Sequence, residues 1–85
     1  MITVHLPPML RPHAGGAHML TVTAPVGTIA ELVAALSRTA PGVVAQLEDA
    51  VYNFAVNDEM LLHAVRAHPL RDGDRVEIVP AISGG

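Results

Sequence analysis

The sequence predicts a single α+β domain, in which one main helix lies across a mixed sheet of four to five strands. Three observations lead to this fold class. First, segments near both ends of the chain alternate between apolar and polar side chains. Second, a segment with the apolar spacing of a helix follows the first two alternating segments. Third, 85 residues are the length of one domain. The chain is 51% hydrophobic but has only one Tyr and one Phe, so aliphatic side chains must fill its core.

The first two strands are predicted from alternation. Residues 2–6 and 20–24 each alternate between apolar and polar positions, which is typical of half-buried strands. Pro7 and Pro8 end the first strand, and the Pro- and Gly-rich residues 9–18 are expected to form a loop. The two strands are therefore expected to form a hairpin with a long connection.

The main helix is predicted to begin at a capping box, Thr28-Ile29-Ala30-Glu31. In this motif the Thr28 side chain accepts a hydrogen bond from the Glu31 N–H, and the Glu31 carboxylate reaches back to the N–H of Thr28. An apolar stripe at helical spacing follows, formed by Ile29, Leu32, Val33 and Leu36. Pro41 and Gly42 are expected to end the helix, followed by no more than a short helical turn over residues 43–47.

The second half of the chain begins with a strand and a short returning edge. Residues 53–57 alternate and predict the strand, residues 57–59 the turn, and residues 60–62 the edge. Leu70 is expected to fill the bottom of the core. Asp72-Gly73-Asp74 predicts a tight turn, since Gly73 can adopt a positive φ.

The last strand begins at Arg75. Val76 and Ile78 are expected on its buried side, and Arg75, Glu77 and Val79 on the other. Pro80 has no N–H, so it is expected to end strand pairing. The domain is therefore expected to span residues 1–80, followed by a flexible tail, residues 81–85, that ends in Gly-Gly.

The predicted order of elements is strand, strand, helix, strand, short strand, strand. This is the order of the β-grasp, or ubiquitin-like, fold. In that fold the first and last strands are parallel neighbours in the centre of the sheet, so the chain end leaves from the middle of a rigid layer.

Composition excludes several classes of function. The chain has no Cys, which excludes disulfides, thiolate metal sites and a cysteine nucleophile. Its net charge is −3 and it has no clustered basic surface, so nucleic acid is not expected as a partner. The N-terminus does not resemble a signal peptide, and no apolar run reaches the ~18–20 residues that span a bilayer. We expect no membrane partner and a cytoplasmic location.

The C-terminal Gly84-Gly85 follows directly after the last strand and a short linker. A free carboxylate on residues without side chains is an unhindered acyl group, and glycine adopts backbone conformations closed to other residues. Such an end can enter a narrow site of a partner protein. The sequence therefore predicts that chemistry takes place at the C-terminus and not in a pocket.

The residues from Phe54 to Gly85 resemble the ThiS/MoaD family of ubiquitin-like sulfur carriers. The resemblance lies in an Ala-Val-Asn strand, the segment Pro69-Leu70-x-Asp72-Gly73-Asp74-x-Val76, the hydrophobic strand, Pro80 and Gly84-Gly85. This half is similar to molybdopterin synthase small subunits. The N-terminal segment Leu10-Arg11-Pro12-His13-x-Gly15-Gly16 resembles a branch whose members supply sulfur for cysteine synthesis and other sulfur-containing products.

The resemblance implies a mechanism. A ubiquitin-activating-type adenylyltransferase would use ATP and Mg²⁺ to adenylate the Gly85 carboxylate. Sulfur from a donor such as a persulfide protein would then replace AMP, giving a thiocarboxylate that a downstream synthase consumes. The chain itself would be a carrier and not an enzyme, with no catalytic residue, no metal site and no permanently bound cofactor. Gly84, Ser83 and Ile82 would be recognised as the tail, and Val79 with Pro80 would dock the partner.

Other functions stay open at this point. The sulfur could serve cysteine, thiamine or a specialised metabolite, or molybdopterin if the chain is the small subunit of the synthase. A ubiquitin-like modifier would instead be conjugated to lysines of other proteins through Gly85. A purely structural subunit would need neither terminal glycine.

The histidines are interpreted as exposed polar residues and not as metal ligands. Four of them, His13, His18, His63 and His68, lie in predicted loops or flank a turn. Without Cys they do not form a recognised zinc spacing.

Overall fold

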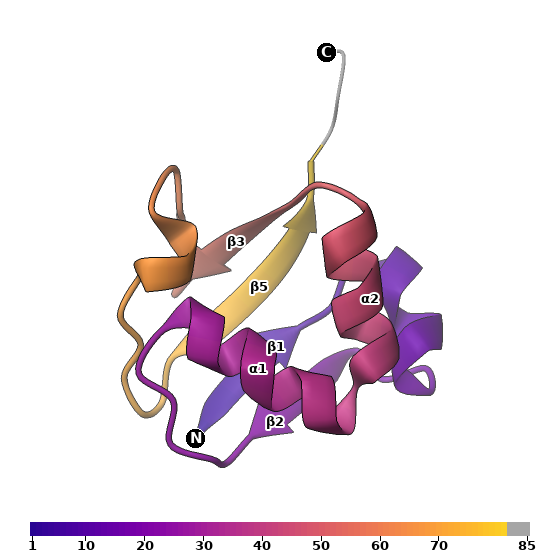
Figure 1. The fold of residues 1–85 in the computed structure, drawn as a ribbon, viewed down its shortest axis with the longest axis horizontal. Coiled ribbons are helices and arrows are strands. Elements are labelled where there is room, and N and C mark those ends of the chain that lie inside the picture. Colours follow the sequence, from indigo (N-terminus) through magenta and orange to yellow (C-terminus); the bar gives the residue numbers. More distant parts are fainter. Residues whose placement is uncertain (82–85) are drawn as a thin grey trace.

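A computed structural model describes residues 1–81 of the chain, in which five strands form one mixed sheet (Figure 1). The strands are β1 (Ile2–His5), β2 (Met19–Val22), β3 (Tyr52–Val56), β4 (Glu59–Met60) and β5 (Arg75–Pro80). The helices are α1 (Ile29–Thr39), α2 (Pro41–Asp49) and the 3₁₀ helices η1 (Pro8–Ala14) and η2 (Val65–Ala67).

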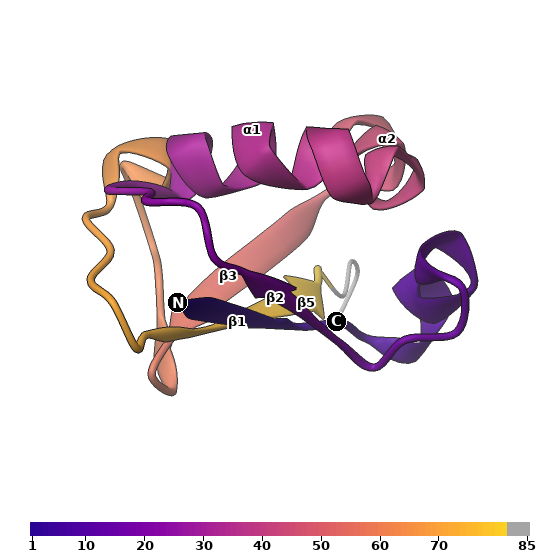
Figure 2. The ribbon, with the colours of Figure 1, turned by 90° about the horizontal axis from the view of Figure 1, so that it is seen from below.

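The strand order is β2-β1-β5-β3-β4, with β1 and β5 parallel and the other pairs antiparallel. Figure 2 shows α1 and α2 on one face of the sheet, and η1 at one end of it. No helix of residues 1–81 lies over the opposite face, which we call the outer face. The predicted β-grasp fold, with its first and last strands as central parallel neighbours, is confirmed.

The cap of α1 differs from the prediction in one contact. The Thr28 hydroxyl accepts from the Glu31 N–H at 3.2 Å, as predicted. The Glu31 carboxylate, however, accepts from the N–H of Gly27 at 2.9 Å and not from that of Thr28. Side chains on a helix tilt toward its N-terminus, so the Glu31 carboxylate reaches beyond the cap residue Thr28. The predicted stripe packs into the core: Ile29, Leu32 and Leu36 are buried and Val33 is half-buried.

The short turn expected over residues 43–47 is instead the nine-residue helix α2. Pro41 begins it, because a proline at the first helical position loses no hydrogen bond. Gly42 permits a close approach of η1: a Cβ at this position would lie 3.2 Å from the carbonyl oxygen of His13. Val43 and Val44 bury the inner face of the helix.

The loop expected over residues 9–18 contains η1, so that prediction is wrong in part. Pro8 stands in the first turn of η1 and Leu10, within it, is completely buried. The N–H of Leu6 donates to the carbonyl of His18 at 2.8 Å, which closes the segment at its base. The buried side chain of Leu10 and this hydrogen bond fix the conformation of the segment, although its Pro and Gly content predicted a loop.

The boundaries of β2, β3 and β4 also differ from the prediction. For the end of β3 and the start of β4, the reason is that the turn between them is tighter than expected. Asn57 and Asp58 form this turn with φ of 49° and 71°, the left-handed conformation that Asn and Asp tolerate in hairpins. β3 therefore ends at Val56 and β4 begins at Glu59, while β2 ends at Val22.

Pro80 does not free the chain from the sheet as expected. It lies opposite Tyr52 as the last residue of β5, and the N–H of Ala81 donates to the carbonyl of Val51 at 3.2 Å. Proline removes only its own donor, so the next residue still pairs. The rest of the expected tail, residues 82–85, lies outside the described residues, and its separation from the domain stays a prediction.

A hydrogen-bond network around Asp74 positions the start of β5. The Asp74 carboxylate accepts from the Asn57 side chain at 2.9 Å and from the Arg71 N–H at 2.8 Å, and the Asn57 side chain accepts from the Arg75 N–H at 2.9 Å. The Arg71 N–H, and after it the Asn57 amide, lower the pKa of Asp74 below its ordinary value. Gly73 in the same turn has the predicted positive φ, 92°.

We predict that Asp74→Asn lowers the free energy of unfolding at neutral pH by about 1–2 kcal/mol, because the variant loses the charged acceptor of two hydrogen bonds. The pKa of Asp74 is lower in the folded than in the unfolded protein. The stabilisation by its carboxylate is therefore complete above the ordinary Asp pKa of about 3.9, and it is lost as pH falls through the folded-state pKa. Urea unfolding across this acid range should show the two proteins converging. The control is Asp49→Asn, since no described residue donates to that exposed carboxylate. A pH-independent difference would contradict the assignment.

Candidate functional site

The site predicted from the sequence is the end of β5. This strand lies between β1 and β3 in the centre of the sheet. Figure 1 shows that it ends at the side of the molecule opposite the N-terminus. Ala81, the last described residue, therefore follows a central strand of the sheet and not an edge strand.

Val79 lies on the outer face, as its alternation predicted. Val76 and Ile78 are 0% and 3% exposed on the helix side, whereas Val79 is half-buried and pairs with the exposed Asn53. No described helix covers this side of the sheet. An aliphatic side chain is therefore available to a partner one residue before Pro80.

A groove of about 530 Å³ borders Val79 on the outer face. It brings together the ends of β1 and β5 with the segment around η1. Its lining residues are His5, Leu6, Pro7, Arg11, His18, Glu77, Ile78, Val79 and Pro80. The two predicted docking residues, Val79 and Pro80, thus share one groove with polar side chains that the sequence analysis did not connect to them.

Arg11 is held at this groove by the backbone. Its Nε donates to the carbonyl of Leu6 at 3.2 Å, and Leu6 is itself bonded to His18 at the base of the η1 segment. Among residues 1–81, no carboxylate lies within 4.0 Å of the Arg11 guanidinium. The isolated leucine at position 10, in an otherwise Pro- and Gly-rich segment, was the one sequence signal that this segment is ordered.

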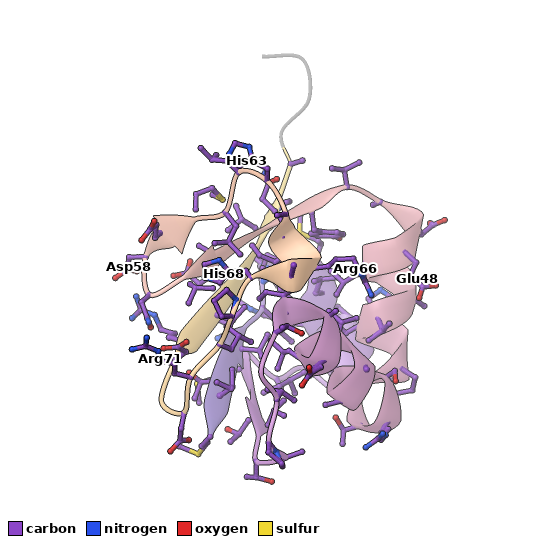
Figure 3. The ribbon with its side chains drawn as sticks, turned by 60° about the vertical axis from the view of Figure 1, so that its left-hand side comes forward. Glu48, Asp58, His63, Arg66, His68 and Arg71 are labelled. Carbon is purple, nitrogen blue, oxygen red and sulfur yellow. The ribbon has the colours of Figure 1, made fainter. Side chains whose placement is uncertain are left out.

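Apolar side chains are exposed around the end of β5. Val51, whose carbonyl pairs with Ala81, is 74% exposed, and Leu62 is 80% exposed. Figure 3 shows His63, the neighbour of Leu62, at the end of the molecule where β5 ends. Both aliphatic side chains are available for contact with another protein.

The histidines do not converge on a metal site. Within the described part of the chain, no three His, Asp or Glu side chains are placed to hold an ion, and Figure 3 shows His63 and His68 apart. His13, His18 and His63 are exposed as predicted. His68 is half-buried, because its carbonyl accepts from the Ile29 N–H at 3.1 Å and holds it against α1.

A second groove, of about 520 Å³, lies at the opposite end beside Met1. Its acidic groups are engaged within the chain. Asp72 pairs with the N-terminal amine, and Glu31 accepts from the Gly27 N–H. We assign it no role in chemistry at the C-terminus.

The remaining predicted site residues, Ile82, Ser83, Gly84 and Gly85, lie outside the described residues. Their proposed roles in attachment and tail recognition therefore stay predictions. In residues 1–81, none of the helices has the length and apolar character needed to cross a bilayer.

Comparison with known proteins gives a consistent set of relatives. A family model described as the ThiS family matches residues 4–85. The sulfur carrier protein CysO of Mycobacterium tuberculosis is 33% identical over 93 aligned positions, which cover 99% of this chain and 98% of CysO.

Two solved structures match the whole fold. The crystal structure of M. tuberculosis CysO has a TM-score of 0.83 and 31% identity, covering 96% of this chain and 100% of that one. A chain of the Amycolatopsis orientalis BexX/CysO complex has a TM-score of 0.82 and 29% identity, with 100% of both chains covered.

Proposed function

The chain belongs to the ThiS family, and from this we propose that it is a sulfur carrier protein that acts through the carboxylate of Gly85. The main support is the match to CysO, which extends over 99% of this chain and 98% of that sulfur carrier. The central position of β5 supports it further, since this strand ends beside an exposed groove suited to docking. A cytoplasmic location is part of the same proposal.

The proposed chemistry belongs to partner proteins. An activating adenylyltransferase uses ATP and Mg²⁺, so that the Gly85 carboxylate attacks the α-phosphate and pyrophosphate leaves. The terminal sulfur of a persulfide protein then displaces AMP, and a thiol cleaves the resulting disulfide to leave the thiocarboxylate. A downstream synthase takes the sulfur. The carrier contributes an acyl group without side-chain hindrance, and it is a substrate in these steps and not a catalyst.

The docking face must supply most of the affinity for these partners. Specific interfaces bury about 800 Å² on each side, far more than a few residues at a chain end can offer. Val79 and Pro80 line the groove nearest to the end of β5. We therefore place the centre of the docking surface at Val79.

We predict that Val79→Asp weakens binding to the activating enzyme at least about tenfold, because a carboxylate replaces an aliphatic contact at the centre of the interface. Titration calorimetry with the purified activating enzyme measures the effect, and thermal unfolding checks the fold. The matched control is Ala34→Asp on the exposed side of α1. Equal affinities for wild type and Val79→Asp would place the docking surface elsewhere.

Labelled sulfur tests the proposed function. The carrier is incubated with the activating enzyme, the persulfide donor carrying the label, and ATP, and is then repurified and mixed with the downstream synthase. The expected result is that label joins the carrier only when ATP is present and then passes to a small molecule. A carrier that never acquires label would contradict the proposal.

The modifier alternative gives a different result in the same reaction. Lysines of other proteins would carry a remnant of the carrier after proteolysis, which for trypsin is residues 76–85 because Arg75 is the last basic residue. The carrier would be consumed without a sulfur product. A structural subunit would function without Gly84 and Gly85. Among sulfur-consuming pathways we propose cysteine synthesis as the first to test, because residues 10–16 resemble that branch and the solved relatives bear the name CysO.

A further inference from the structure

We propose that Arg11 is a second docking residue, which binds a carboxylate side chain of the partner protein seated against Val79. The partner is the activating enzyme of the proposed function, so the inference rests on that function and adds the chemistry by which the docking face selects it. Neither the strand alternation nor the terminal glycines point to this residue.

The first support is the distribution of charge. The chain has eight acidic residues against five arginines, and a net charge of −3. Only one of the eight, Glu77, lines the groove, where the charge of Arg11 offsets it, and His5 and His18 add polar groups. The groove is therefore an approximately neutral region of an acidic protein, so an acidic partner segment meets little repulsion there.

The second support is that Arg11 is pre-organised. Leu10, next to it, is completely buried and fixes η1 in the core. Gly42 of α2 lets the backbone of His13 approach closely from the other side. A side chain held in this way loses little conformational freedom on binding, which favours affinity.

The third support is the state of the guanidinium. Its Nε is used by the carbonyl of Leu6, and no described residue hydrogen-bonds to either Nη nitrogen or pairs with the charge. Arg11 lines an open groove, and two Nη nitrogens without a partner in the described residues can hold a carboxylate with two parallel hydrogen bonds. Arginine is enriched among the residues that dominate binding energy at interfaces, and Arg11 shares its groove with Val79 and Pro80.

The test is binding of purified activating enzyme to Arg11→Gln and Arg11→Lys at low and high salt. Arg11→Gln is expected to weaken binding about tenfold at low salt and to reduce the salt dependence, because a charge-assisted contact is lost. Arg11→Lys is expected to recover part of the affinity, since it keeps the charge but not the planar fork. The control is Arg38→Gln, an exposed arginine on α1.

Sulfur loading separates this inference from the proposed function. When the carrier is varied up to saturation over a fixed amount of activating enzyme, Arg11→Gln is expected to reach the wild-type maximal rate with a raised KM, because the chemistry at Gly85 is intact. Wild-type affinity for Arg11→Gln, or an equal loss for Arg38→Gln, would overturn the role of Arg11. If the wild-type carrier bound through Arg11 but was never loaded with sulfur, the proposed function would be wrong and the role of Arg11 in docking would stand.

Discussion

Gly84→Trp is expected to abolish sulfur loading of the chain while leaving its folded domain unchanged. The activating site must enclose an adenylate and exclude water, so a bulky side chain next to the reacting carboxylate obstructs entry. The buried core that the structure describes lies between Ile2 and Ile78, and we expect it to fold without a contribution from residue 84. Mass spectrometry of the loading reaction gives the rate, and circular dichroism with thermal unfolding reports on the fold.

The matched control is Ala34→Trp, which adds the same side chain to the exposed side of α1. It is expected to load at the wild-type rate. If Gly84→Trp were loaded at a rate comparable to wild type, the activating site would not be narrow. The terminal glycines would then not be needed for entry of the chain end into that site.

Leu10→Ala is expected to lower the free energy of unfolding by about 2–5 kcal/mol, the range for truncating a buried leucine. Leu10 has no exposed surface, and it joins η1 to the core. For a domain of this size, whose total stability is on the order of 5–10 kcal/mol, the loss is a large fraction. Urea unfolding monitored by circular dichroism measures it.

The adjacent Met9 is the control, since it belongs to the same 3₁₀ helix but is 51% exposed. Met9→Ala is expected to change stability by no more than about 0.5 kcal/mol. If Leu10→Ala unfolded at the wild-type urea concentration, η1 would not be part of the core, and the fixed position of Arg11 would lose its explanation.

The fold was predictable because its main signals are local and periodic. Alternation defined β1 and β5, and the helical stripe that begins at Ile29 defined α1. The buried positions Val76 and Ile78, with Val79 opposite, followed from the same alternation. Once the order of elements is known, the parallel pairing of the first and last strands follows from the β-grasp arrangement.

Helix η1 was missed, and α2 was predicted only as a short helical turn, because proline and glycine can either end a helix or stand within one. Pro8 and Pro41 break a preceding element, but each stands in the first turn of a new one, where its missing N–H costs nothing. Gly42 likewise indicated a stop, whereas it permits close packing against His13. Only the tertiary contacts distinguish these roles.

The docking groove was predictable only in part. The outward position of Val79 can be derived from one strand, but the groove also requires Arg11 and His18, which are more than sixty residues away along the chain. They meet Val79 because β1 and β5 are parallel and the η1 segment is closed by the bond between Leu6 and His18. Such a juxtaposition has no periodic signal in the sequence.

Intact-mass analysis of the wild-type chain, with fragmentation to locate the change, tests the central claim most directly. The chain is incubated with its activating enzyme, a persulfide donor and ATP. We predict that one oxygen is replaced by one sulfur, that the change lies in the fragment containing Gly85, and that omitting ATP prevents it. An unchanged mass in the complete reaction, or a sulfur located within residues 1–81, would contradict the account.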